Sequence, residues 1–317
     1  MSNRSFNVNG LNSLTRVFES AEQIIFDDSS RIVLMSDCHR GDDSWADDFS
    51  KNQYIYFAAL NHYYDRNYTY IEIGDGDELW KNKNLSDIVR VHGDVFWLLS
   101  KFFNEGRFYS IFGNHDIVKN SRIVKRRHYS YFDEYENRSI TLFEDITHHE
   151  GLVLRHTVTD GRIFLVHGHQ ADYMNYRLWR LTRFLVRYFW RPLESFGVND
   201  PTSAAKNYDK KVLIEKKLIE WVTANNQMLI AGHTHRPMFP EPGEPPYFND
   251  GSCVHPRSIT SIEIADGQII LVKWEVKTRK DGILFVGREV LAGPRRLTDY
   301  FNSLQAQYVP EGGTIKA

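Results

Sequence analysis

Five short segments that contain aspartate, histidine or asparagine each follow a run of residues that is expected to form a buried β-strand. The segments are Asp37-Cys38-His39, Gly74-Asp75, Gly113-Asn114-His115-Asp116, His167-Gly168-His169 and Gly232-His233-Thr234-His235. The runs before them are residues 31–36, 68–73, 107–112, 162–166 and 227–231, which are short and mostly apolar. Because ligands of open α/β sheets bind beyond the carboxyl ends of the strands, we expect these side chains to gather at one sheet edge.

The order of the remaining elements predicts a layered α/β fold in one domain. Helix-like runs at residues 48–65 and 85–104 separate the first three strands. After a Pro-rich loop at 241–246, strands at 247–249, 258–264 and 268–276, with Ala265-Asp266-Gly267 as a tight turn, predict a β-meander that forms a second sheet. Residues 172–220 are expected to be mostly helical, with an interruption at 192–201. We therefore expect a single domain over residues 1–309, a helical insert at about 172–224, and a flexible tail at 310–317.

Net charge, cysteine count and the distribution of apolar residues disfavour several classes of protein. The formal net charge of the 317 residues is -2, which disfavours a protein whose main partner is nucleic acid. The two cysteines, Cys38 and Cys253, cannot form a disulfide framework. No apolar run is long enough to span a bilayer, and the polar N-terminus lacks the apolar region of a secretory signal. These features predict a cytoplasmic enzyme.

The residue types in the five segments are those of a metal site. Alternate side chains of an extended chain point the same way, so Asp37 and His39 can face one ion together, as can His233 and His235. Carboxylate, imidazole and amide oxygen without thiolate suit Mn, Fe, Zn or Mg. Each segment alone has an ordinary explanation as a turn or helix cap; the five together, in this order at strand ends, favour the metal site.

Together the segments resemble the calcineurin-like metallophosphoesterase superfamily, whose pattern is D-x-H, G-D-x-x-D, G-N-H-D/E, a histidine followed by glycine, and G-H-x-H. The match runs from Asp37 to His235, and Asn249-Asp250-Gly251-Ser252 is similar to the N-x-G-S strand end of that family. The resemblance implies an α/β/β/α fold, in which two mixed β-sheets pack as a sandwich flanked by helices. The sequence departs from the family at Glu78, which replaces the last aspartate of the second motif and keeps its acidic character.

The resemblance also implies a role for each matching residue. The first metal ion would be bound by Asp37, His39 and His235, and the second by Asn114, His167 and His233. Asp75 would bridge the two ions, His115 would protonate the leaving oxygen, and Asp116 would orient His115. The implied cofactors are two divalent ions, with Mn favoured and Fe, Zn, Ni or Mg as alternatives, which activate a hydroxide for attack on phosphorus. Asp77 and His169 receive no role from the resemblance and are candidates for contacts behind the ligands.

Two basic segments are candidates for contacts with substrate or membrane. Residues 173–191 contain arginines at a spacing of three or four and no acidic residue; they are Arg177, Arg180, Arg183, Arg187 and Arg191. This pattern predicts a basic amphipathic helix that binds an anionic ligand or an anionic membrane surface, or else a lid that packs its apolar face on its own domain. Arg180 and Arg187 are candidate substrate contacts. After the 114–116 loop, Arg122 and Arg126, beside Lys125 and Arg127, are further candidates unless they form a solvated helix face.

The predicted function is hydrolysis of a phosphomonoester, a phosphodiester or a nucleotide-linked pyrophosphate in a small-molecule or lipid-linked substrate. Glu78-Leu79-Trp80, residues 232–237 and the Arg- and aromatic-rich insert are similar to the branch that contains UDP-2,3-diacylglucosamine hydrolase. That branch cleaves a pyrophosphate at the membrane surface, which implies a peripheral contact with the inner face of the membrane. The chain departs from the branch at His115, where that hydrolase usually has arginine. Alternatives are a nuclease, a Ser/Thr protein phosphatase and a non-catalytic scaffold; the complete ligand set disfavours the scaffold.

Overall fold

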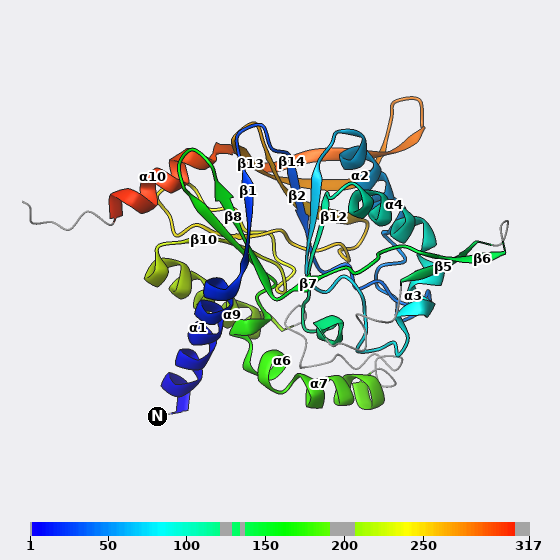
Figure 1. Cartoon of the computed structure of the whole chain (residues 1–317), viewed down its shortest axis with the longest axis horizontal. Coiled ribbons are helices and arrows are strands. Elements are labelled where there is room, and N and C mark those ends of the chain that lie inside the picture. Colours follow the sequence, from blue (N-terminus) through cyan, green and yellow to red (C-terminus); the bar gives the residue numbers. More distant parts are fainter. Residues whose placement is uncertain (1, 121–128, 134–136, 191–206, 308–317) are drawn as a thin grey trace, which may run out of the picture.

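The computed structural model describes residues 2–120, 129–133, 137–190 and 207–307. Within these residues, two mixed β-sheets pack face to face and helices cover both outer faces (Figure 1). This arrangement confirms the predicted α/β/β/α sandwich. The expected interruption at 192–201 and the expected tail at 310–317 lie outside the described residues.

The larger sheet has seven strands within the described residues, in the order β14-β13-β12-β2-β3-β4-β7. They are β2 (Ile32–Met35), β3 (Thr69–Ile73), β4 (Phe108–Ile111), β7 (His148–His149), β12 (Ser258–Ala265), β13 (Gln268–Thr278) and β14 (Leu284–Arg296). The strands from β2 to β7 are parallel, whereas β12, β13 and β14 are joined antiparallel to β2 and to one another. The predicted meander therefore extends the sheet of the first strands.

The smaller sheet has the strand order β1-β8-β9-β10-β11. Its strands are β1 (Glu22–Phe26), β8 (Gly151–His156), β9 (Arg162–Val166), β10 (Met228–Ala231) and β11 (Tyr247–Asn249). Strand β11 was expected in the meander, but it pairs parallel with β10 and so belongs to this sheet. A separate hairpin is formed by β5 (Ser130–Asp133) and β6 (Arg138–Thr141).

Helices enclose the two sheets and extend beyond their lower edge (Figure 1). The larger sheet is covered by α2 (Gln53–Asp65), α3 (Leu85–Val91) and α4 (Gly93–Asn104), and the smaller one by α1 (Ser2–Ser20) and α9 (Tyr208–Asn225). The other helices are α6 (Tyr173–Arg177), α7 (Trp179–Leu185), α10 (Leu297–Gln307), the 3₁₀ turns η1 (Ile117–Asn120) and η2 (His169–Ala171), and the π-helical turn η3 (Val186–Trp190). None of the described helices is both long and apolar enough to cross a bilayer.

The central strands are mostly apolar because both of their faces are covered. In β2, Ile32 and Leu34 pack between the two sheets, whereas Val33 and Met35 pack against the helices on the outer face. This alternation follows the two-residue period of a strand. It explains why the strands before the five segments read as continuous apolar runs.

Two predicted helices differ from the observed ones because side chains bind the backbone locally. The helix expected at 48–65 begins at Gln53, since the carboxylate of Asp47 accepts hydrogen bonds from the amides of Phe49 and Ser50 and holds a turn. The helix expected at 85–104 is interrupted at His92, whose buried ring bonds to Asp47 at 2.9 Å. Neither contact can be recognised from the spacing of apolar residues.

Candidate metal centre

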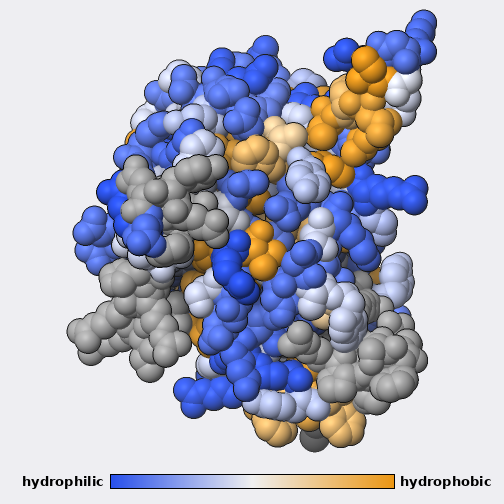
Figure 2. Space-filling model, turned by 90° about the vertical axis from the view of Figure 1, so that its right-hand side faces the viewer, coloured by the Kyte–Doolittle hydropathy of each residue, from blue (hydrophilic) through white to orange (hydrophobic). Residues whose placement is uncertain are grey.

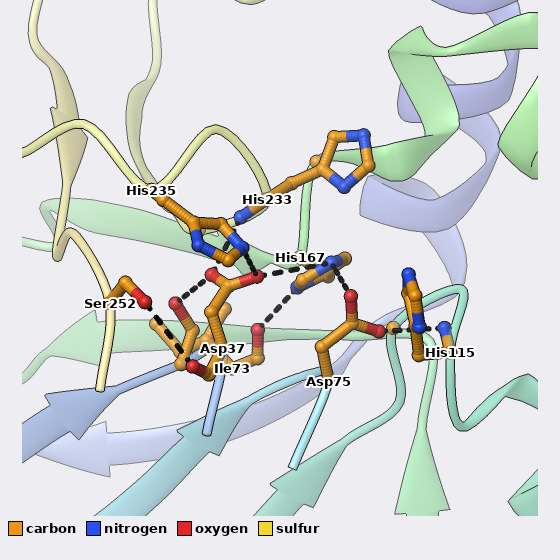
Figure 3. Close-up of polar contacts among 12 residues, drawn as sticks. Asp37, Ile73, Asp75, His115, His167, His233, His235 and Ser252 are labelled. Carbon is orange, nitrogen blue, oxygen red and sulfur yellow. Dashed lines mark hydrogen bonds and ion pairs between the residues drawn. The ribbon is translucent and has the colours of Figure 1, made fainter. Parts of the chain in front are cut away.

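The five predicted segments meet at the carboxyl ends of strands from both sheets (Figure 3). Strands β2, β3 and β4 of the larger sheet lead to Asp37, Asp75 and Asn114. Strands β9 and β10 of the smaller sheet lead to His167 and His233. The site is therefore built where the two sheets of the sandwich end side by side, and each sheet supplies part of it.

The side chains form adjoining groups with the spacing of metal ligands. One group contains Asp37, His39 and His235, and another contains Asp75, His167 and His233; within each group the potential ligand atoms lie within 4.8 Å of one another. Asp37 Oδ1 lies 3.0 Å from His235 Nε2, and Asp75 Oδ2 lies 3.1 Å from His167 Nε2. A third group joins His39 and Asp75 to His115, so Asp75 is shared between groups.

Four residues of the site have a buried polar atom that makes no hydrogen bond, although Asp37 faces His235, His167 faces Asp75 and His233 faces Asp172 as ion pairs. The four atoms are Asp37 Oδ1, Asn114 Oδ1, His167 Nε2 and His233 Nε2. A buried polar atom without a partner costs about 1–3 kcal/mol, so atoms of this kind are rare unless a ligand satisfies them. Oxygen and imidazole nitrogen atoms that converge in this way fit divalent cations such as Mn, Fe or Zn.

Electrostatics at the site favour a cation. Burial raises the pKa of Asp37, but the imidazoles of His235 and His167 outweigh it and hold the pKa well below the usual range. Burial lowers the pKa of His167, but Asp75 and Asp37 raise it to about 9. Both shifts arise because carboxylates and imidazoles are crowded together in a region with little solvent. A divalent ion would relieve this crowding by displacing protons from the imidazoles.

The ligand loops are held in a left-handed backbone conformation that side chains rarely adopt. The φ angles are 52° at Asp37, 49° at His39, 67° at His233 and 53° at His235. The prediction that each D-x-H or H-x-H pair lies on extended chain was therefore wrong, although Asp37 and His39 do converge. His233 instead turns toward His167, and His235 turns toward Asp37. Such backbone strain is found mainly at functional sites.

Neighbouring main-chain groups orient the ligands. His167 Nδ1 donates a hydrogen bond to the carbonyl of Ile73 at 2.8 Å, which leaves Nε2 as the nitrogen that faces the other ligands. The amide of His233 donates to Asp37 Oδ2 at 2.8 Å. Glycine is required at Gly113, where a Cβ atom would lie 2.1 Å from Asp75 Oδ1.

His115 is oriented by Glu78 and not by Asp116. Its Nδ1 lies 2.9 and 3.0 Å from the two carboxylate oxygens of Glu78, and its ring stacks on Trp80 with centroids 4.3 Å apart. Asp116 accepts hydrogen bonds from the amides of Gly113 and Gly76 and shows no bond to the His115 ring among the described contacts. The expectation that Asp116 orients His115 is thus corrected: its carboxylate instead binds the backbone of the two loops that contain Gly76 and Gly113.

The remaining candidates divide into three kinds. Arg187 directs its guanidinium at main-chain carbonyls of residues 79–82, so this side chain is already bound within the protein. Arg180 is exposed and lies over the ring of Trp179. Arg122 and Arg126 lie outside the described residues.

Behind the ligands lies a buried network of charges that contains Asp77, a candidate from the sequence, together with Arg40, Glu72 and Lys119, which the motifs did not indicate. Arg40 bonds to Glu72 at 2.8 Å and to Asp77 at 2.7 Å, and Lys119 bonds to Asp77 at 2.8 Å and to Asp116 at 2.7 Å. All five are almost fully buried. Glutamate inside the otherwise apolar strand β3 was the one sequence signal that could have indicated such a network. His169 is also buried, and neither of its ring nitrogens has a hydrogen-bond partner in the described structure.

The chain was compared with protein families, with proteins that have a curated description and with solved structures. A family model described as calcineurin-like phosphoesterase matches residues 30–237, which is more than half of the chain and includes all five segments. No protein with a curated description matches the chain. Among solved structures, the crystal structure of Chaetomium thermophilum Vps29 is similar, with a TM-score of 0.35 and 11% sequence identity, over 83% of this chain and 96% of that chain.

Proposed function

Because the chain belongs to the calcineurin-like phosphoesterase family, we propose that it is a hydrolase that uses two divalent metal ions to cleave phosphoester bonds. One observation carries the proposal: the carboxylates and imidazoles of both predicted sets converge, and Asp37 of one set and Asn114, His167 and His233 of the other have buried atoms without a hydrogen bond. A protein that kept the fold but lost the chemistry would be expected to replace such costly groups by apolar ones. Substrates of the proposed enzyme are phosphomonoesters, phosphodiesters or nucleotide-linked pyrophosphates.

Each residue has a distinct task in the proposed site. Asp37, His39 and His235 would hold one ion. Asn114, His167 and His233 would hold the other, and Asp75 would contact both. When bound, the two ions would supply positive charge for the phosphoryl oxygens and an activated water.

The chain itself supplies the proton for the leaving group. Glu78 binds His115 Nδ1, so the proton on Nε2 is the one that His115 can give to the leaving oxygen. The stacked ring of Trp80 limits rotation of the imidazole. General acid catalysis matters most when the leaving group is a poor one such as an alkoxide, which favours alkyl phosphoesters over activated esters as the natural substrates.

Metal content and a substrate panel test the proposal. Protein purified without chelator should contain about two transition-metal ions per chain, as two-metal hydrolases do, and should hydrolyse at least one class of phosphoester in the panel. Asp75→Ala should lose most of the metal and the activity, whereas Asp160→Ala, an exposed control, should keep both. Absence of stoichiometric metal together with no metal-dependent turnover would contradict the proposal. Cleavage of DNA or RNA in the same panel would favour a nuclease.

We further propose that the enzyme works on a lipid-linked substrate at an anionic membrane surface. The support is an exposed stripe on α6, α7 and η3, formed by Tyr173, Arg177, Arg180, Leu181, Phe184, Tyr188 and Phe189. Phe184 and Tyr188 are 59% and 55% exposed. Figure 2 shows apolar side chains along the lower edge of the molecule, at the height at which α7 lies in Figure 1. The alternative arrangement, a lid that packs its apolar face on its own domain, is present only in part: Val186 is buried and Leu178, Trp179, Leu185 and Trp190 are half-buried, whereas Leu181 and Phe189 are exposed.

The composition of the stripe is that of a membrane-surface helix. Aromatic residues favour the interface between headgroups and acyl chains, and each arginine near an anionic surface contributes about 1 kcal/mol. Asn175, Thr182 and Val186 of the same segment are buried on its inner side. The outer side thus presents aromatic and basic groups together, and an anionic lipid surface is complementary to both.

Vesicle binding tests the membrane contact. Wild-type protein should sediment with vesicles of phosphatidylcholine and phosphatidylglycerol at low salt, and less with phosphatidylcholine alone. The double change Phe184→Ser, Tyr188→Ser and the double change Arg177→Glu, Arg180→Glu should each reduce binding without slowing hydrolysis of a small soluble phosphodiester. Leu284→Ser is the matched control, because Leu284 is 67% exposed on a different part of the fold. Wild-type protein that does not bind anionic vesicles would contradict the membrane contact.

A further inference from the structure

Arg187 of η3 binds the turn formed by residues 79–82 through three main-chain carbonyls. Its Nε donates a hydrogen bond to the carbonyl of Trp80 at 2.7 Å, and its Nη2 donates to the carbonyls of Leu79 and Asn82, both at 2.8 Å. Arginine suits this task because its planar guanidinium carries several N–H donors in fixed directions, whereas lysine offers a single ammonium centre. The contact joins two segments separated by more than one hundred residues.

Two side chains in this turn or directly before it contact the His115 ring, which His39 also meets edge-on with centroids 4.7 Å apart. Trp80 stacks on the His115 ring. Glu78 bonds to His115 Nδ1, and one of its oxygens accepts hydrogen bonds from the amides of Trp80 and Lys81 at 3.2 and 3.1 Å. The position of the turn therefore affects where the His115 ring lies, and Arg187 binds the main-chain carbonyls of that turn.

The backbone around Arg187 is unusual in a way that aims the side chain inward. After the α-helical residues of α7, the chain forms a π-helical turn from Val186 to Trp190. A π turn changes the direction of successive side chains relative to an α-helix and is found mainly at functional sites. Arg187 consequently faces the 79–82 turn, while Phe184 and Tyr188 on either side of it remain exposed.

We propose that Arg187 is a positioning residue for the reaction: it holds the 79–82 turn so that Trp80 and Glu78 keep His115 aligned with the leaving oxygen. The inference rests on the proposed function, in which His115 is the acid. Arg187 also ties the segment with the exposed stripe to the turn beside the catalytic histidine. Contact of the stripe with a surface or substrate would thus be transmitted to His115 through one guanidinium.

Hydrogen exchange measured by mass spectrometry reports the first step of this coupling without any activity measurement. In Arg187→Ala, the amides of Trp80 and Lys81 should exchange faster than in the wild type, because the turn that holds their bonds to Glu78 is released. Arg187→Lys should lie between the two, since one ammonium can replace only part of the three bonds. Arg180→Ala, an exposed arginine of the neighbouring helix, should leave the exchange of both amides unchanged.

Turnover of two substrates reports the second step. Arg187→Ala should reduce kcat for an alkyl phosphodiester by about ten- to a hundredfold, which is the scale expected for a misplaced catalytic group. It should affect a nitrophenyl phosphodiester much less, because nitrophenolate needs no proton, and metal content should stay unchanged. The change should also be non-additive with Trp80→Leu, since both act through the same stacking contact.

Two results would overturn the positioning role. One is unchanged amide exchange at Trp80 and Lys81 in a folded Arg187→Ala variant. The other is an equal loss of turnover on both substrates, which would show that Arg187 stabilises the turn without acting through His115. If Arg187→Ala does not fold, Arg187→Lys is subject to the same two criteria. Failure of the proposed function is distinguishable, because wild-type protein would then lack metal-dependent turnover, whereas the amide exchange of Arg187→Ala would still be measurable.

Discussion

Replacing Lys119 by methionine tests whether the buried charges behind the site depend on one another. Lys119 is 1% exposed, and its ammonium lies 2.8 Å from Asp77 and 2.7 Å from Asp116. Burial lowers the pKa of Lys119, but Asp116 and Asp77 outweigh it and hold the pKa well above its usual value. The lysine is therefore charged in the folded protein, and Lys119→Met leaves two buried carboxylates without their shared cation.

The expected loss of stability follows from these contacts. Removing one partner from a buried ion pair costs about 3–5 kcal/mol. We expect the lower end, about 3 kcal/mol, because Arg40 still bonds to Asp77 and main-chain amides still bond to Asp116. At about 2.1 cal/mol/K per residue, the unfolding entropy of 317 residues is about 0.7 kcal/mol/K, so the melting temperature should fall by about 4–5 °C.

Calorimetry of the wild type, Lys119→Met and Lys280→Met at pH 7 measures this difference. Lys280 is exposed near the end of β13, so its replacement should change the melting temperature by less than about 1 °C. Metal analysis of each variant separates loss of fold stability from loss of bound ions. If Lys119→Met melts within 1 °C of Lys280→Met at equal metal content, the carboxylates do not depend on Lys119 and the reasoning fails, since about 3 kcal/mol could not be hidden in that interval.

Three further outcomes are expected. His115→Ala should lower kcat/KM for an alkyl phosphodiester by about 10²–10⁴-fold and for a nitrophenyl ester far less; equal losses would exclude the acid role. Burial raises the pKa of Asp47, but hydrogen bonds from His92 and backbone amides hold the pKa below its usual value. The ionised carboxylate therefore stabilises the fold above about pH 4, and this contribution is lost as the pH falls further. The difference in urea midpoint between wild type and Asp47→Asn should shrink below that pH, and a constant difference would refute the reasoning. Gly251→Ala should lower the free energy of unfolding, measured in urea, by about 1–3 kcal/mol. The reason is that φ at this position is +85° and the new Cβ atom would lie 2.0 Å from Thr260 Oγ1. A variant as stable as the wild type would contradict this expectation.

Much of the fold could be predicted from local patterns. The strands that precede Asp37, Asp75 and His233 are buried on both faces, so each reads as a short apolar run that ends in polar residues. Elements without such a pattern were missed, including α1, β1, β8, β14 and α10. Strand β14, for example, contains arginine, glycine and proline and is partly exposed, which are features that sequence patterns do not associate with a long strand.

The sequence by itself determined the family, the layered fold and the side chains that meet at the sheet edge, because these depend on residue type and on the order of strand ends. The tertiary structure decided which groups those side chains touch. Glu78, 37 positions away, binds His115, although Asp116 is its neighbour in sequence. Arg187 turns inward while Phe184 and Tyr188 stay exposed. Periodicity describes which residues share a face of one element, but contacts between elements depend on how their backbones pack, and no local pattern records that packing.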